Sequence, residues 1–321
     1  MRLKVDVKPF SFRLIQTLIT SQGILKDKKG WLLRIESQCG HSGWGEVSPL
    51  YQGEWIKCQK FLKSINKEVS RQELEAGINI WPGALAFGIG AALAELDGLI
   101  GSRQNGWLKA PQSAFLLPKN QSLLETIDSV LQKKSLKNHP ITFKWKVAIE
   151  SFTKEKELLF QILERLPSNA RLRIDANAGL NRIQAQKWAD ILRHETRLEW
   201  LEQPLHREDF EGLNSLAKQI PVALDESLYV KPSLRKDWQG WQIRRPLLEG
   251  DPRILLKELE QGVGYRMVST GFETGIGLRW VHHLAALQQQ GPTPTAPGLA
   301  PGWCPQSPLF NSNPMLVWEA L

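Results

Sequence analysis

Two different rhythms of apolar and polar residues follow one another along the chain. The first part alternates at 3–14 and 30–37, which predicts β-strands because successive strand residues face opposite sides of a sheet. The segment 43–50 predicts a turn into a third strand. Segments 53–74 and 87–102 carry apolar residues at helical spacing. Strands followed by helices predict an α+β arrangement for this part.

From about residue 112 onward, short apolar strands alternate with amphipathic helices. The expected strands lie at 113–118, 141–149, 171–176, 198–203, 221–226, 241–246, 265–271 and 294–301. The expected helices lie at 121–134, 153–166, 181–194, 207–219, 252–262 and 277–290. This alternation is typical of βα units with parallel strands. The number of units, and the lack of a glycine-rich dinucleotide fingerprint after the first strand, favour a (β/α) barrel over a doubly wound sheet.

The composition predicts a basic surface, since 41 Lys and Arg residues against 33 Asp and Glu give a net charge of +8. The basic residues are spread over the whole length, and the densest groups lie at 26–29 and 133–134. There is no basic tail and no basic motif interleaved with aromatic residues. This pattern favours a solvated surface that attracts a small anionic molecule, so we expect no nucleic-acid or membrane partner.

Cysteine usage and the amino-terminal segment bear on the compartment. Cys39, Cys58 and Cys304 are too few and too widely spaced for a disulfide framework or a zinc site, which favours a reducing compartment. The first residues lack the apolar run of a signal peptide, and no segment approaches the about 20 apolar residues that cross a membrane. These features predict a soluble cytoplasmic protein.

Three acidic residues end three consecutive expected strands. Asp175, Glu202 and Asp225 are 27 and 23 residues apart, which is about one βα unit in each case. Barrel enzymes place their chemistry at the carboxyl ends of the strands, so these carboxylates should converge and repel one another. A divalent cation removes that repulsion, and a set of oxygen ligands suits Mg²⁺, with Mn²⁺ as an alternative ion.

Lys144 and Lys146 lie two residues apart in a neighbouring strand and therefore share one face. Cations crowded together in a partly dry site have lowered pKa values, which makes a lysine usable as a base near neutral pH. A lysine beside the α-carbon of a carboxylate held on Mg²⁺ can remove an α-proton and support an enediolate. Such an arrangement is the general pattern of the enolase superfamily.

The chain resembles this enolase superfamily over nearly its whole length. The matching pieces, in order, are KWK (144–146), RIDAN (173–177), WLEQP (200–204) and ALDES (223–227). Residues 43–50 and 87–96 are similar to parts of the superfamily's capping domain. The resemblance implies an α/β fold, a modified (β/α)7β TIM-like barrel over 105–310. It also implies an α+β capping domain over 1–104, to which 311–321 returns.

Within the superfamily the chain resembles most the o-succinylbenzoate synthase family, through its short length and the segments 268–278 and 296–301. Members of that family are hydro-lyases of menaquinone or phylloquinone biosynthesis. The resemblance implies Mg²⁺-dependent dehydration of 2-succinyl-6-hydroxy-2,4-cyclohexadiene-1-carboxylate to o-succinylbenzoate, a syn elimination through an enediolate.

The resemblance also implies a role for each candidate residue. Asp175, Glu202 and Asp225 would bind Mg²⁺. Lys146 would take the α-proton and return a proton to the departing hydroxyl, while Lys144 would keep Lys146 deprotonated and support the enediolate. The expected substrate-binding residues are Arg173, Ser269, Thr270, Gly271 and Gly298. Asn177 would buttress the metal-binding end of its strand, and the loop around 17–28 would act as a lid.

The sixth expected strand departs from the superfamily pattern, which has a lysine followed by proline at its end. Here the matching pair is Arg245-Pro246, while Lys231-Pro232 comes too soon after Asp225 for a full βα unit. Because arginine stays protonated, Arg245 can supply a fixed charge opposite Lys146 but cannot serve as a second base. Arg244 should point to the other face, toward a partner on a neighbouring helix or toward water.

The arginine favours elimination on one face over two alternatives that remain open. One is an N-succinylamino acid racemase or dipeptide epimerase of the same superfamily, which needs two opposed bases. The other is a non-catalytic basic barrel that binds nucleic acid or a partner protein, against which the lysine pair and the three acids argue.

Overall fold

The computed structural model describes residues 2–20, 23–102, 104–119, 122–133 and 140–321. The chain packs as two compact units, one formed by 1–112 with 244–321 and the other by 113–243. The boundary between residues 243 and 244 falls inside a strand, so one sheet contributes to both units. The domain bounds expected above follow the sheets instead, and they stay a prediction.

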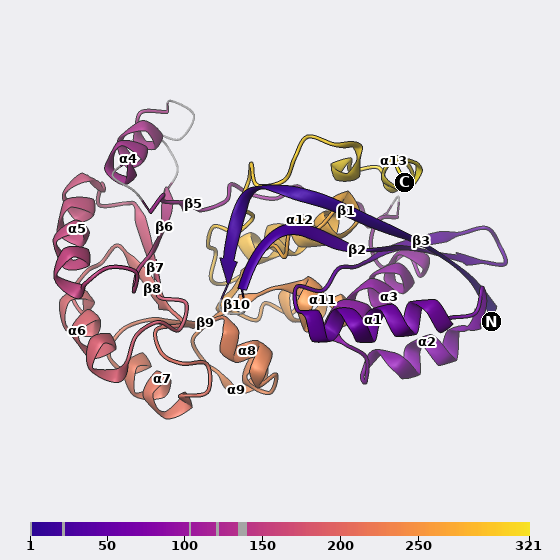
Figure 1. Ribbon diagram of the computed structural model, residues 1–321, viewed down its shortest axis with the longest axis horizontal. Coiled ribbons are helices and arrows are strands. Elements are labelled where there is room, and N and C mark those ends of the chain that lie inside the picture. The colour runs from indigo at the N-terminus through magenta and orange to yellow at the C-terminus, as the bar shows by residue number, and fades with distance from the viewer. Residues whose placement is uncertain (1, 21–22, 103, 120–121, 134–139) are drawn as a thin grey trace. The chain divides into compact units, whose positions relative to one another are not determined.

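The first unit contains a four-stranded antiparallel sheet with the order β3-β2-β1-β4. Its strands are β1 (Arg2–Thr20), β2 (Gly23–Ser37), β3 (Ser42–Val47) and β4 (Glu68–Ser70). β1 and β2 form the long ribbon drawn in indigo in Figure 1. The expected lid at 17–28 is the end of this ribbon, and its residues 21–22 lie outside the described residues.

Helices α1 (Gln52–Ser64), α2 (Arg71–Ile78) and α3 (Gly83–Leu96) accompany this sheet. The prediction of one helix over 53–74 is wrong, because β4 interrupts it and pairs with β1. The physical reason is a strong helix start at Ser70, whose hydroxyl accepts from the Glu73 N–H while the Glu73 carboxylate accepts from the Ser70 N–H. This capping box satisfies two backbone donors and begins a new helix.

The glycines of β3 allow α3 to lie directly on the sheet. A Cβ atom at Gly43 would stand 1.8 Å from the Ala92 carbonyl oxygen, and one at Gly45 would stand 1.9 Å from that of Gly88. No larger side chain fits such a separation, so glycine at alternate positions of β3 follows from helix packing. This close packing explains the two glycines at the start of the segment 43–50.

The remaining strands form one seven-stranded sheet with the order β11-β10-β9-β8-β7-β6-β5. They are β5 (Phe115–Leu116), β6 (Thr142–Lys146), β7 (Arg171–Asp175), β8 (Leu198–Glu202), β9 (Val222–Leu224), β10 (Trp241–Arg244) and β11 (Arg266–Val268). The pairs from β5 to β10 are parallel, which confirms the predicted α/β class with βα units. The expected strand at 294–301 is reduced to a single parallel bridge between Ser269 and Gly298.

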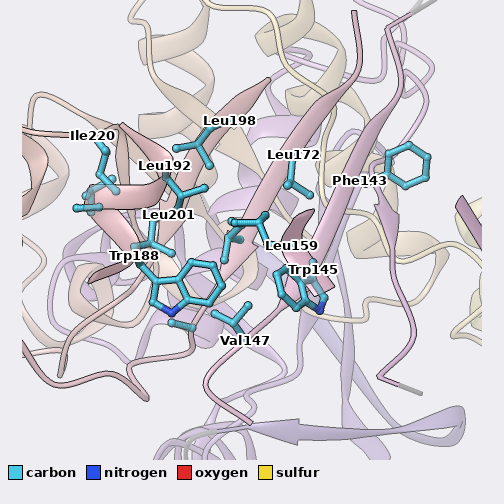
Figure 2. Packing of buried hydrophobic residues seen from close by; sticks show 14 of the residues in the cluster. Phe143, Trp145, Val147, Leu159, Leu172, Trp188, Leu192, Leu198, Leu201 and Ile220 are labelled. Carbon is cyan, nitrogen blue, oxygen red and sulfur yellow. The ribbon is translucent and has the colours of Figure 1, made fainter. Parts of the chain in front are cut away.

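In the unit 113–243, helices cover one face of the parallel sheet, as Figure 1 shows for β6 to β8. These helices are α4 (Leu123–Leu131), α5 (Phe152–Arg165), α6 (Arg182–Leu192), α7 (Phe210–Ala217), α8 (Glu226–Val230) and α9 (Leu234–Asp237). Figure 2 shows Phe143 and Trp145 of β6 packed in this core with Leu159 and Trp188. Because strand side chains alternate, the neighbouring lysines of β6 face the other side of the sheet.

The first unit also holds the carboxyl-terminal elements. They are α10 (Pro246–Glu249), α11 (Pro252–Glu260), α12 (Gly275–Gln290), the 3-10 helix η2 (Pro308–Phe310) and α13 (Pro314–Glu319). α13 packs on the antiparallel sheet, where the rings of Trp318 and Trp44 meet edge to face at 5.6 Å. Lys8 of β1 donates to the Trp318 carbonyl oxygen. Of the helices that the structure describes, none is both long and apolar enough to span a bilayer.

Candidate active site

The carboxyl ends of β6, β7 and β8 bring three of the expected site residues into register. Lys146 pairs with Asp175 across β6 and β7, and Asp175 pairs with Glu202 across β7 and β8. Asp225 follows β9, in which Ala223 is the register partner of Glu202. Parallel strands end at the same edge, so residues from four separate chain segments gather there. The structure thus brings these expected residues together.

Lys144 lies between two of the expected metal-binding carboxylates. Its Nζ atom is 2.8 Å from Asp175 Oδ2 and 2.6 Å from Glu202 Oε1. Burial opposes the positive charge, but the attraction of Asp175 and Glu202 outweighs it and raises the pKa of Lys144 above its ordinary value. The expectation that crowding with another lysine would lower this pKa is wrong for Lys144, because its ammonium group is within hydrogen-bond distance of two carboxylates.

The carboxylates influence one another through their charges. Burial, and then the charge of Asp175, raise the pKa of Glu202, and Asp225 adds to this rise. For Asp175, burial acts against ionisation, but the nearby Lys144 and Lys146 ammonium groups lower its pKa overall. In the part of the chain that is described, no three His, Cys, Asp or Glu side chains are arranged as a ready metal-binding group.

The donor set nevertheless fits a hard divalent cation. Its three side chains offer only oxygen atoms, and the Lys144 ammonium already stands as a cation between Asp175 and Glu202. The second oxygen of Glu202, Oε2, accepts a hydrogen bond from Trp200 Nε1 at 3.3 Å. A bond of this kind fixes the orientation of a ligating carboxylate.

Lys146 has a different environment from Lys144. Its Nζ donates to Asn177 Oδ1 at 2.9 Å, and the backbone N–H of Asn177 donates to Asp175 Oδ1 at 2.9 Å. Asn177 takes a φ of 44°, in the left-handed region that asparagine tolerates better than most residues. It therefore ties the expected base to the end of β7, in line with the buttressing role expected for it.

Arg173 is completely buried one layer below the carboxylates. Its Nε donates to Glu199 Oε2 at 2.6 Å, and its guanidinium lies 4.2 Å from the centre of the Trp200 ring. Trp200 is the residue that donates to Glu202. These contacts place Arg173 in the support of the site, and its expected contact with substrate stays a prediction.

The remaining expected site residues lie in the other packing unit, where they form a group of their own. Arg245 Nη1 donates to Ser269 Oγ at 3.1 Å and to the Thr270 carbonyl oxygen at 2.9 Å. Ser269 Oγ in turn donates to the Gly298 carbonyl oxygen at 3.1 Å. The N–H of Gly271 donates to Glu273 Oε1. These bonds link four of the five residues directly, and Gly271 is linked to the Thr270 hydroxyl through Glu273.

Arg244 takes the opposite side of the strand end, as expected. It is 2% exposed, and its guanidinium pairs with Glu249 Oε2 at 2.7 Å and with Glu258 Oε2 at 2.8 Å. These glutamates come from α10 and α11, so neighbouring helices supply the predicted partners.

Sequence reasoning missed two buried polar residues at the site, Gln203 and Glu226. Gln203 is buried, and its Oε1 accepts from the backbone N–H groups of Asp225 and Ser227 while its Nε2 donates to Ser227 Oγ. Glu226 is largely buried, and burial together with the charge of Asp225 raises its pKa to about 8. Both lie directly beside expected metal ligands, which was the available signal for them.

Known proteins resemble this chain in both sequence and fold. The family model described as "Enolase C-terminal domain-like" matches residues 134–236. The chain is 32% identical over 290 residues to o-succinylbenzoate synthase of Thermosynechococcus vestitus, covering 84% of this chain and 85% of that protein. It is 28% identical to o-succinylbenzoate synthase of Salmonella paratyphi B, covering 80% and 78% of the two chains.

Solved structures show the same fold. The o-succinylbenzoate synthase of Thermosynechococcus elongatus, described as complexed with Mg in the active site, superposes with a TM-score of 0.80 at 26% identity. That match covers 99% of this chain and 100% of the other. The N-succinyl Arg/Lys racemase of Bacillus cereus has a TM-score of 0.73 at 16% identity, covering 96% and 89%, and so shows the fold alone. The chain belongs to the o-succinylbenzoate synthase family of the enolase superfamily.

Proposed function

We propose that this protein is a Mg²⁺-dependent hydro-lyase that converts 2-succinyl-6-hydroxy-2,4-cyclohexadiene-1-carboxylate to o-succinylbenzoate in menaquinone or phylloquinone biosynthesis. The observation that carries the proposal is the register of Lys146, Asp175 and Glu202, in a chain 32% identical to an o-succinylbenzoate synthase. The substrate is a small anion, which suits a chain with a net charge of +8.

In this proposal Asp175, Glu202 and Asp225 hold Mg²⁺. When bound, the ion neutralises the substrate carboxylate and stabilises the negative charge that develops there during reaction. Trp200 orients Glu202 through its indole N–H, and Gln203 fixes the backbone of Asp225. The protein thereby holds the ligands in place before substrate arrives.

Lys146 performs both proton transfers. Its neutral amine takes the α-proton, and the electrons of the broken C–H bond pass into the carboxylate as an enediolate. When those electrons return to form the new carbon–carbon double bond, the hydroxyl group leaves and receives a proton from the Lys146 ammonium. One molecule of water is lost, and the lysine is again neutral. Asn177 orients the amine through the bond at 2.9 Å.

Arg245 contributes a permanent positive charge and no base. A guanidinium does not lose its proton at physiological pH, so Arg245 cannot serve as the second base that racemisation or epimerisation requires. This favours the dehydration over racemisation of N-succinylamino acids or epimerisation of dipeptides. The racemase and epimerase among the solved relatives are at most 21% identical and share only the fold.

The direct test is an ultraviolet assay of o-succinylbenzoate formation with purified protein, with and without Mg²⁺. We expect turnover that requires the ion and stops with a chelator. The same protein is incubated with N-succinylamino acids in D₂O, where we expect no inversion of the α-carbon. Inversion without dehydration would favour the racemase, and strong salt-dependent retention of DNA without turnover would favour the non-catalytic alternative.

A further inference from the structure

A buried polar cluster joins β2, β3 and the loop before α12, all within the unit formed by 1–112 and 244–321. Its charged members are Lys28 of β2, Glu46 of β3 and Glu273 of the loop, and each is at most 1% exposed. Burying ionisable side chains is costly unless each is paired and hydrogen-bonded. The proposed chemistry uses none of these three, so their position needs another explanation.

Glu273 holds the turn that follows β11. Its Oε2 accepts from the Thr270 hydroxyl, 2.5 Å away, and its Oε1 accepts from the Gly271 N–H at 2.7 Å. The Thr270 hydroxyl also accepts from the N–H of Phe272 at 2.8 Å. Phe272 has a φ of 65°, a conformation that a bulky residue keeps only when its surroundings enforce it. Glu273 accepts two of the hydrogen bonds that hold this turn.

The same turn accepts hydrogen bonds from Arg245. The Thr270 carbonyl oxygen accepts from Arg245 Nη1, and Ser269 Oγ accepts from the same nitrogen. The Thr270 hydroxyl and the Gly271 N–H both donate to Glu273, so both groups are used in hydrogen bonds inside the protein. Glu273, Thr270 and Arg245 therefore form one continuous chain of hydrogen bonds.

Lys28 lies near this chain on the side of the sheet. Lys28 Nζ donates to the Ser48 carbonyl oxygen at 2.6 Å. Burial lowers the pKa of Lys28 to about 8, and the opposing attraction comes first from Glu273 and then from Glu46. The positive charge thus lies near both buried carboxylates and offsets their repulsion.

Glu46 holds the start of α12 by the same means. Its Oε2 accepts from the Thr274 N–H and hydroxyl at 2.9 and 2.6 Å, and from the Gly277 N–H at 3.2 Å. A Cβ atom at Gly277 would stand 2.9 Å from this oxygen. Glu46 is therefore as buried as Glu273, but it fixes the helix rather than the Thr270 turn.

We propose that Glu273 is a positioning residue that acts through Thr270 to set the place of the Arg245 guanidinium. This inference rests on the proposed function, in which Arg245 supplies a fixed cation to the dehydration. A carboxylate is required because two donors point at it, and a glutamine in its place would turn an N–H group toward one of them. Arg245 would then lose the fixed carbonyl oxygen that orients it.

The test is a double-mutant cycle on kcat. Glu273→Gln should lower kcat by about tenfold, the usual order for a residue that orients a functional group. In the Arg245→Met background the same change should have little further effect, because its target is gone. Thr270→Val, which removes only the hydroxyl link, should lower kcat in the same direction. Fully additive effects of Glu273→Gln and Arg245→Met would overturn the proposal.

Glu46→Gln is the matched control, since it alters an equally buried carboxylate of the same cluster. It should leave kcat within about threefold of the wild type and show no coupling to Arg245. An equal loss of kcat in both glutamine variants would mean that destabilisation of the whole buried cluster lowers kcat. That result would contradict the positioning role of Glu273.

Amide hydrogen exchange separates this inference from the proposed function. In Glu273→Gln the Gly271 amide should exchange at least about tenfold faster than in the wild type, whereas in Glu46→Gln the faster exchange should lie at Thr274 and Gly277. If the wild type makes no o-succinylbenzoate, the proposed function fails, but faster exchange at Gly271 still supports the hold of Glu273 on the turn. Unchanged exchange at Gly271 overturns that hold whatever the activity.

Discussion

Lys144 and Lys146 leave the same face of β6, two residues apart, but their ammonium groups have different partners. Lys144 bridges the carboxylates of Asp175 and Glu202, while Lys146 donates to the side-chain oxygen of Asn177. An ammonium between two carboxylates is held in its charged form. The arrangement therefore divides the pair into a charge partner and a candidate base.

Lys146→Ala should lower kcat for o-succinylbenzoate formation by about 10³-fold or more, because the variant lacks the group that moves the proton. The ultraviolet assay measures the loss, and circular dichroism checks the fold. Lys154→Ala on the exposed surface of α5 is the control and should turn over normally. Near-normal turnover of Lys146→Ala would contradict the mechanism.

Arg245→Lys should retain most of the activity, because either side chain can place a positive charge at this strand end. Arg245→Met should lower kcat by about 10²-fold, the order found when one preorganised charge-stabilising donor is removed. The pair of variants is compared in the same assay. Equal activity of Arg245→Met and the wild type would show that the charge has no part in the reaction.

Trp200→Phe should weaken Mg²⁺ binding by about tenfold, because the indole N–H no longer orients Glu202. Isothermal titration calorimetry with Mg²⁺ alone measures this Kd without any need for substrate. The matched control is Trp55→Phe, since Trp55 stacks on Trp31 in the packing unit that lacks the carboxylates. An unchanged Kd in Trp200→Phe would remove this residue from the metal site.

Arg244→Met should lower the free energy of unfolding by about 1.5–3 kcal/mol, because it removes the ion pairs of Arg244 with Glu249 and Glu258, of which Glu258 keeps Arg266 as a partner. Adding Glu249→Gln should recover part of that loss, because it neutralises the carboxylate that pairs with Arg244 and not with Arg266. Urea unfolding followed by fluorescence measures both variants. A loss below about 1 kcal/mol for Arg244→Met would mean that water already compensates these carboxylates.

Stability at mildly acidic pH should depend on His283. Burial lowers the pKa of His283 to about 4, and its Nδ1 accepts from the Leu108 N–H, which requires the neutral ring. The folded state therefore binds this proton less tightly than the unfolded state. The histidine's contribution is complete above pH 6.5 and is lost as the pH falls toward 4, with a slope of up to about 1.4 kcal/mol per pH unit.

His283→Asn keeps an acceptor without the titration, so the difference between wild type and variant should shrink between pH 6.5 and 4. Urea unfolding at a series of pH values measures this difference. A difference that stays constant over this range would rule out the neutral buried ring.

Local pattern predicted most of the strands, but it misjudged the helix at 53–74 and the strand at 294–301. The segment 53–74 keeps helical spacing throughout, yet β4 replaces its middle because Glu68 and Val69 find partners in β1. A strand of three residues has little local signal, and its stability comes from a neighbour more than sixty residues away in the sequence. The capping pair Ser70 and Glu73 was a readable sign of the break.

The sequence by itself determined which charged residues end the parallel strands. Asp175, Glu202 and Lys146 follow from the two-residue period of a strand and the length of a βα unit, and both are local properties. The family resemblance followed from the same residues, and the comparisons confirm it.

Only the tertiary structure decided which partner each charge has. Arg244 and Arg245 are neighbours in the chain, but only the packing of α10 and α11 showed that Glu249 and Glu258 pair with Arg244. Glu46 and Thr274 are 228 residues apart, and no sequence period joins them. Hydrogen bonds between distant segments depend on how the elements pack, so tertiary structure decided which partner each buried polar group has.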